Sequence, residues 1–149
     1  SITWSSDRPQ GIAEAGPRGM EQPMHVTLLK SKIHRASVTE VDLEYEGSCA
    51  IDADLLEASG LREYERIELY NVANGERFAT YAIQEAAGSG RVAVNGAAAH
   101  KAGVGDQVII CAYCQLDAQE ARDHRPRIVR VDEANRIVEK TNGTAHRVA

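Results

Sequence analysis

The chain has 149 residues, of which 43% are hydrophobic and 26% are charged, and its formal net charge at pH 7 is -5. This length predicts one ordinary domain, with a core of Val, Ile, Leu and Ala because Phe and Trp each occur once. The acidic balance argues against nonspecific nucleic-acid binding, and the lack of any apolar run of about 20 residues argues against a membrane-spanning helix.

Residues 1–23 precede the first regular element that the sequence predicts. They contain Gly, Pro, Ser and several charged residues, without an apolar stretch of signal-peptide type. We interpret them as a disordered extension or a cloning remnant. Met24 is a plausible natural start, and we expect the folded domain to extend over 24–149.

Two short strands are predicted between His25 and Leu43, where apolar residues alternate locally and many neighbours are β-branched. Three basic side chains, Lys32, His34 and Arg35, are expected in or beside the turn between these strands. Such a cationic corner can bind an anion, although a solvated turn is the commoner explanation.

The pair Gly47-Ser48 can carry chemistry on the chain itself. Attack of the Ser48 hydroxyl on the carbonyl of Gly47 would turn the peptide into an ester, and elimination and hydration would then leave a pyruvoyl group at residue 48. A glycine suits this position, because a residue without a Cβ tolerates strained backbone and close approach to its carbonyl. Gly-Ser pairs also occur in countless turns, so the dipeptide alone does not establish cleavage.

A short helix is predicted over residues 53–59. Asp52 is a good N-cap for it, and Gly60 is a good residue to end it. The helix would bury Leu55 and Leu56.

A hairpin is predicted next, because two alternating runs, 67–72 and 77–83, flank the pair Asn74-Gly75. On the second run, alternate side chains would share a face. One face would carry Arg77, Ala79 and Tyr81, and the other Phe78, Thr80 and Ala82.

Small residues at 96–99 follow a predicted strand over 91–95. Such a stretch either packs tightly, which is the commoner case, or leaves room for a ligand. The most apolar run, 104–112, predicts a strand that is buried on both faces. A short helical stretch near 117–122 and a last strand over 128–131 would complete the domain.

At least six short strands with little helix predict a mainly β fold, namely a small closed barrel with short helices. The polar tail from about residue 141 is expected to fray. The three cysteines are too few for a disulfide framework and favour a reducing compartment, the cytoplasm. Cys111 and Cys114 have CxxC spacing, but they would point to opposite faces of a strand, so no metal is predicted. Cys49 is interpreted as a buried thiol.

Three segments, 47–52, 71–83 and 94–100, strongly resemble the bacterial pyruvoyl-dependent aspartate 1-decarboxylases in sequence, order and spacing. The similarity extends from Met24 to about Arg122. It implies a double-psi β-barrel, assembled as a homotetramer with active sites between subunits. It also implies conversion of L-aspartate to β-alanine and carbon dioxide, through a Schiff base to a pyruvoyl group, for pantothenate biosynthesis. Whether cleavage needs an activating protein stays open.

The resemblance also implies roles for individual residues. Cleavage would separate Gly47 from Ser48, Ser48 would become the pyruvoyl group, and Tyr81 would donate the proton. Thr80 would contact the substrate and assist cleavage. The other residues that would line the substrate site are Gly96, Ala97, Ala98, Arg77, Lys32, His34, Tyr45 and Asn95.

The chemistry of these side chains fits the roles. Arg77 can grip a carboxylate with two hydrogen bonds, and the phenol of Tyr81 is a weak acid that can deliver a proton. Thr80 and Tyr81 point to opposite faces of an ideal strand, so a bulge there or a site shared with a neighbouring subunit is expected.

Two other functions remain open on the sequence alone. A noncatalytic barrel module could bind a small anion or a partner protein through Arg77 and Lys32, and its chain would stay intact. A cysteine-dependent hydrolase at Cys49 is a third and weaker hypothesis. Cleavage at Gly47 would distinguish the decarboxylase from the binding module.

Overall fold

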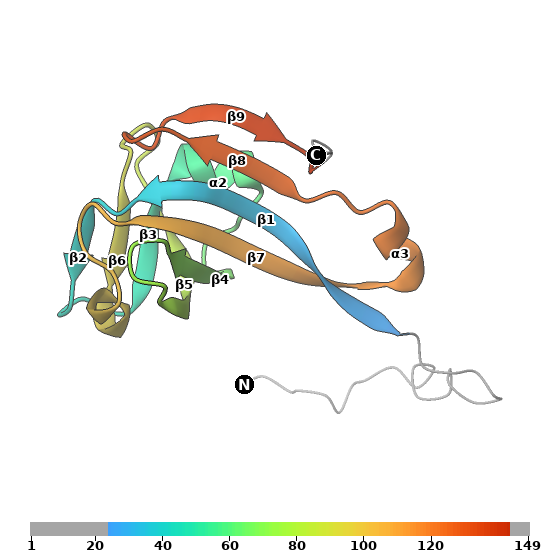
Figure 1. Cartoon of the computed structure of the whole chain (residues 1–149), viewed down its shortest axis with the longest axis horizontal. Coiled ribbons are helices and arrows are strands. Elements are labelled where there is room, and N and C mark those ends of the chain that lie inside the picture. Colours follow the sequence, from blue (N-terminus) through green and yellow to red (C-terminus); the bar gives the residue numbers. More distant parts are fainter. Residues whose placement is uncertain (1–23, 144–149) are drawn as a thin grey trace, which may run out of the picture.

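The computed structural model describes residues 24–143. The predicted extension over 1–23 and the end of the predicted frayed tail, 144–149, lie outside the described residues. The described part is mainly β, as predicted, with one sheet of nine strands and a few short helices (Figure 1). The elements are β1 (His25–Ser37), β2 (Glu40–Asp42), β3 (Ser48–Asp52), α2 (Ala53–Ser59), β4 (Arg66–Asn71), β5 (Arg77–Glu85), β6 (Val92–Asn95), the 3-10 helix η1 (Gly96–His100), β7 (Gln107–Asp117), α3 (Ala118–Arg122), β8 (Arg127–Val131) and β9 (Ile137–Thr141).

The sheet curls back on itself. Its strands pair in the order β2-β6-β3-β5-β4-β7-β1-β8-β9. Strands β1 and β2 lie far apart in this order, yet only Val38 and Thr39 separate them in the chain. The N–H of Thr39 donates to Val92 O at 2.8 Å, and that of Val38 donates to Asp106 O at 2.9 Å. The chain itself therefore joins the two sides of the curled sheet, as expected for a small barrel.

The predicted helix is confirmed from cap to cap. The Asp52 carboxylate accepts the N–H of Asp54 at the start of α2, and Gly60 ends the helix with a φ of 75°. Leu55 and Leu56 are 1% and 3% exposed. They join a core of aliphatic side chains from the strands, which includes Ile33, Ile51, Ile67, Leu69, Val92, Val94, Val108 and Ile110. No helix of the described part is long and apolar enough to cross a membrane.

Two strands, β1 and β2, lie between His25 and Leu43 as predicted, but the first is long and the basic residues do not form the turn between them. Lys32 and His34 lie inside the single long strand β1, and the turn comes later, after Ser37. Arg35 has a φ of 62° and lies at a register shift of the β1–β7 ladder. This irregularity interrupts the alternation of buried and exposed residues, and so in sequence the long strand resembles two short ones.

The C-terminal strands also differ from their predicted form. Strand β7 runs on to Asp117 and is buried on both faces only over 110–112, because its second half pairs with the start of β1 alone. Strand β9 was not predicted, since its only apolar residues, Ile137 and Val138, are adjacent and do not alternate with polar ones. It ends at Thr141, where fraying was expected to begin.

Asn135, in the turn between β8 and β9, joins three segments of the fold. Its side chain is 2% exposed. The Oδ1 atom accepts the N–H of Ser37 at 2.7 Å, and Nδ2 donates to Ser37 O at 2.9 Å and to Gly90 O at 2.8 Å. Its φ of 62° is in the left-handed region, which Asn tolerates better than most residues. The last hairpin is therefore fastened to the end of β1 by one amide.

We expect Asn135→Ala to lower the free energy of unfolding by about 3 kcal/mol, because buried backbone groups lose their partners and Ala is strained at this φ. Urea unfolding monitored by circular dichroism measures this loss. Asn135→Gly is the matched control, since it removes the amide but not the tolerance of positive φ, and should lose less. If both variants unfold like the parent chain, Asn135 does not fasten the hairpin.

Candidate active site

Ser48 begins strand β3 and is held in place by a neighbouring strand. Its partner in the antiparallel β3–β6 ladder is Asn95. The two residues are 1% and 6% exposed, and Asn95 Nδ2 donates to Ser48 Oγ at 3.1 Å. Asn95 is the N-cap of η1 but makes no side-chain cap hydrogen bond, because its amide is directed to the serine instead. The structure thus pairs a buried hydroxyl with one amide donor.

The close backbone contact at this site involves Gly96, and not a strained Gly47 as the sequence suggested. Gly47 has no positive φ, and a Cβ placed on it would meet no atom within 4 Å. Gly96 has a φ of 74°, and a Cβ there would lie 2.6 Å from Gly47 Cα and 2.8 Å from Gly47 N. Only glycine lets η1 pack against the peptide that precedes Ser48.

We expect Gly96→Ala to slow cleavage at residue 47 by at least about tenfold, because displacement of this peptide by even a fraction of an ångström disturbs the attack geometry. Intact-mass spectra recorded over time after purification measure the fraction of cut chain. Gly75→Ala is the matched control, since Gly75 has a φ of 78° but open space around its Cβ position. Equal effects of the two variants would show that backbone strain, and not the contact with Gly47, is responsible.

Strand β5 places Tyr81 beside the start of β3. Ala82, which follows Tyr81, pairs with Cys49 in the parallel β3–β5 ladder. Arg77, Ala79 and Tyr81 are exposed, while Phe78, Thr80 and Ala82 are half-buried or buried, as the alternation predicted. The predicted bulge at Thr80 is absent, because the β4–β5 register is regular there. Tyr81 therefore faces the serine's side of the strand pair, and Thr80 points to the other face.

The basic residues expected in the pocket lie on the exposed face of a neighbouring part of the sheet. Lys32 is paired with Cys111 of β7. Burial raises the pKa of the Cys111 thiol, whereas its hydrogen bond with Tyr113 and the charges of Lys32 and Arg77 act to lower it. The Arg77 guanidinium lies 3.8 Å above the ring of Tyr70. Both cations act on the Cys111 thiol and so lie in one region of the sheet, Lys32 on β1 and Arg77 on β5.

His34 has the one buried side-chain polar atom without a hydrogen-bond partner among residues 24–143, namely Nδ1. Burial lowers its pKa below 6.5, and the charges of Lys32, Arg130 and Arg35 lower it further. The imidazole is therefore neutral at pH 7, and it can accept or donate a hydrogen bond but adds no positive charge.

Cys49 is a buried thiol, as predicted. It is 0% exposed, and burial raises its pKa to about 12. A thiol in this state is not an effective nucleophile at neutral pH. Among the described residues, no three His, Cys, Asp or Glu side chains form a group that could hold a metal ion.

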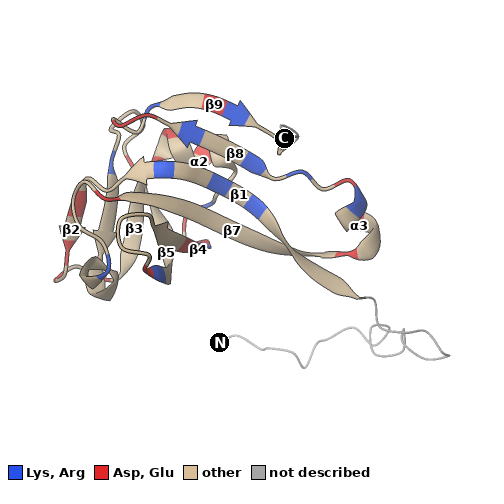
Figure 2. Ribbon diagram, in the orientation of Figure 1, with Lys and Arg blue, Asp and Glu red and all other residues tan. Residues whose placement is uncertain are grey.

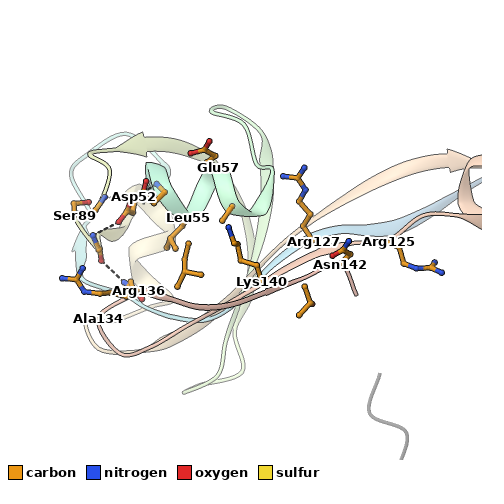
Figure 3. Close-up of a pocket in the computed structure, with 17 residues that line it drawn as sticks. Asp52, Leu55, Glu57, Ser89, Arg125, Arg127, Ala134, Arg136, Lys140 and Asn142 are labelled. Atoms are coloured by element: carbon orange, nitrogen blue, oxygen red, sulfur yellow. Dashed lines mark hydrogen bonds between the residues drawn. The ribbon is translucent and has the colours of Figure 1, made fainter. Parts of the chain in front are cut away.

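Of two hollows in the described part, only the smaller is lined by predicted site residues. One of about 510 Å³ is lined by Tyr45 and Asn95 together with residues of β2 and β6. Tyr45 is 54% exposed at its mouth. The larger hollow, about 920 Å³, lies between α2 and the β8–β9 hairpin and contains none of the predicted site residues (Figure 3). Sequence reasoning missed it because its walls are far apart in the chain.

The sequence of this chain is similar to one family of known proteins. The model of the family described as Aspartate decarboxylase matches residues 24–138. The aspartate 1-decarboxylase of Thioalkalivibrio sulfidiphilus (strain HL-EbGR7) is 63% identical over 115 residues, which cover 77% of this chain and 91% of that protein. The aspartate 1-decarboxylase of Bordetella avium (strain 197N) is 58% identical over 116 residues, which cover 78% and 95%.

One solved structure is also similar. The crystal structure of the rationally designed mkDPBB_sym_86 protein covers 60% of this chain and 96% of its own, with 18% identity and a TM-score of 0.38. At that score the likeness decides nothing about the barrel type, and the double-psi connectivity stays a prediction.

The chain forms a mainly β domain with a buried serine after a glycine. Because decarboxylases match it over most of its length, it belongs to the lyase class of enzymes. The chain belongs to the aspartate decarboxylase family.

Proposed function

We propose that this chain is a self-processing aspartate 1-decarboxylase, which converts L-aspartate to β-alanine and carbon dioxide. The observation that carries the proposal is the arrangement at residues 47 and 48. Asn95 donates to the buried hydroxyl of Ser48, while Gly96 holds the preceding peptide at close contact. A buried hydroxyl fixed beside its own peptide suits intramolecular attack, because the reacting atoms are already positioned.

Cleavage would begin with attack of Ser48 Oγ on the carbonyl carbon of Gly47, which exchanges the peptide for an ester. Elimination would release the Gly47 carboxylate and leave a dehydroalanine, and water would convert this to a pyruvoyl group with loss of ammonia. The geometry given above is that of the uncut chain. In that form, Ser48 Oγ also lies 3.4 Å from Glu46 O, a long and weak hydrogen bond.

The surroundings fit a small carbonyl group at position 48. Asn95 supplies one amide donor, and Gly96, Ala97 and Ala98 keep side-chain volume low at the start of η1. A pyruvoyl group supplies a sink for the electrons left behind when carbon dioxide departs. Tyr81, on the strand beside β3, would deliver the proton that replaces the carboxyl group.

The substrate carboxylate would be bound by cations of a neighbouring chain. Arg77 lies four residues from Tyr81 on the same face of β5, which is about 13 Å along a strand and longer than an aspartate molecule. Arg77 and Lys32 have no carboxylate within 4.0 Å in the described part, and His34 Nδ1 lacks a partner. These groups support a homotetramer with sites between subunits, in which they complete the site of the next copy.

The proposal extends to the setting of the reaction. A β-alanine-forming enzyme would supply pantothenate biosynthesis, and we place it in the cytoplasm. An activating protein for cleavage is compatible with a buried Ser48, since a partner could shift the peptide into the attack geometry.

Intact-mass spectrometry of the purified chain tests the proposal. We expect two fragments that divide after Gly47, with residue 48 lacking its amine. Borohydride together with L-aspartate should add a substrate-derived mass to the fragment that begins at residue 48. A sample that decarboxylates aspartate while remaining a single chain with an ordinary Ser48 would contradict the mechanism. A chain that stays intact and releases no carbon dioxide would favour a noncatalytic module that binds a small anion or a partner.

A further inference from the structure

The larger hollow lies between α2 and the β8–β9 hairpin (Figure 3), and none of the candidate active-site residues lines it. Its volume of about 920 Å³ is within the range of small-molecule sites, roughly 300–1,000 Å³. Its walls differ in character. Leu55, Ala58 and Ile137 contribute apolar surface, whereas the hairpin contributes basic and amide side chains.

The register of the hairpin gathers these polar side chains on its inner face. Val129 is 0% exposed and is paired with Lys140, so both point toward α2. Arg127 lies two residues before Val129 on β8 and so shares this face, and Asn142, just after the end of β9, also lines the hollow. Figure 3 shows Lys140, Arg127 and Asn142 one after another along the hairpin.

The cations on this face have no acidic partner within the described residues. Within residues 24–143, neither Arg127 nor Lys140 has a carboxylate within 4.0 Å, and the same holds for Arg125 and Arg136 at the ends of the hollow. On the outer face of the same hairpin, Arg130 is paired with Glu139 at 3.1 Å. Basic residues are visible along β8 and β9 in a protein that is acidic overall (Figure 2). Cations that line one hollow without acidic partners favour the binding of an anion there.

Two further contacts shape this side of the hollow. The Arg127 side chain packs against the end of α2, since a Cβ placed on Gly60 would be 3.2 Å from Arg127 Nη1. The guanidinium is therefore held near the negative end of the helix and is partly preordered. Asp52, across the hollow, accepts the N–H groups of Asp54, Gly88 and Gly90, so its charge is already engaged.

We propose that this hollow binds a small molecule that carries phosphate groups, with its anionic end on Arg127, Lys140 and Asn142 and its body on Leu55, Ala58 and Ile137. Phosphate oxygens suit an arginine fork, a lysine point charge and an amide donor together. The carboxylates of Asp54 and Glu57 on the helix wall repel the anion and keep it at the hairpin side. This site is independent of cleavage and decarboxylation.

Isothermal titration of the full-length Ser48→Ala chain with inorganic pyrophosphate and with ADP tests the site. Ser48→Ala is used so that binding is measured whether or not the proposed activity exists. We expect saturable binding with a Kd of about 1 mM or lower at low ionic strength, weakened by added salt. Tighter binding of ADP would identify an organic phosphate, and equal binding an inorganic one; either supports the site.

Lys140→Gln in the same background should weaken pyrophosphate at least about tenfold, which is the scale of one charged hydrogen bond. Arg130→Gln is the matched control, because it removes one positive charge from the other face of the same hairpin. Lys32→Gln is a second control, at the candidate active site. If either control weakens binding as much as Lys140→Gln, or if no saturation occurs below about 20 mM in the parent chain, the proposal is overturned.

Discussion

Ser48→Ala should yield a chain that remains uncut and releases no carbon dioxide from L-aspartate. The substitution removes the only atom that can attack Gly47 from this position, so no carbonyl group forms and the expected loss of turnover is complete. The fold should survive. Ser48 makes one hydrogen bond of normal length, to Asn95, and its loss costs about 1 kcal/mol. Intact-mass spectrometry and carbon dioxide release measure the two effects on the same sample.

Cys49→Ala is the matched control for this experiment. Cys49 is the next residue on β3 and is buried, and its thiol has a pKa of about 12. Replacing it by Ala removes little volume, and we expect normal cleavage and at least about half of the parent activity. Cleavage of Ser48→Ala, or failure of folded Cys49→Ala to be cut, would show that the nucleophile is the Cys49 thiol and not the Ser48 hydroxyl.

Elements with local signals could be predicted from the sequence. The helix over Ala53–Ser59 was predicted with its bounds, because the signals that start and end it, Asp52 and Gly60, act on their own neighbours. The β4–β5 hairpin followed from Asn74-Gly75 for the same reason. Strand β1 was misread, since its length depends on pairing with β7 and its bulge depends on tertiary register.

At the candidate site, too, contacts between distant segments could not be predicted from the sequence. Ser48 was singled out through the Gly47-Ser48 pair and Asn95 through the family resemblance, and the β3–β6 register brings them together. The close contact was assigned to Gly47, whereas the structure places it at Gly96, because an approach between distant segments leaves no mark on either one alone. The Asn135 amide was missed as well. An Asn between two alternating runs is a turn signal that could have located the hairpin, but not the contact with Ser37.

Tyr81→Phe should give a chain that is cut normally but turns over about 10²–10⁴ times more slowly, the usual effect of removing a general acid. Cleavage uses Ser48 and the peptide before it, and the phenol has no part in that step as proposed. Tyr81 is 37% exposed, and its hydroxyl makes no hydrogen bond within residues 24–143, so Phe should leave stability nearly unchanged. Mass spectrometry measures the cut, and carbon dioxide release measures the turnover.

Two comparisons separate proton delivery from other roles of this strand. Tyr64 is 74% exposed, and its backbone N–H donates to Ala82 O, next to Tyr81 on β5. Tyr64→Phe removes an exposed hydroxyl near that strand and should leave turnover unchanged. Thr80 points away from Ser48 of its own chain, so Thr80→Val should impair cleavage through the site of a neighbouring copy, the opposite result to Tyr81→Phe. Because borohydride trapping of L-aspartate needs the carbonyl group but not the proton donor, Tyr81→Phe should still be trapped at the parent level. Loss of trapping together with turnover would mean that Tyr81 binds substrate or shapes the site, and that another group delivers the proton.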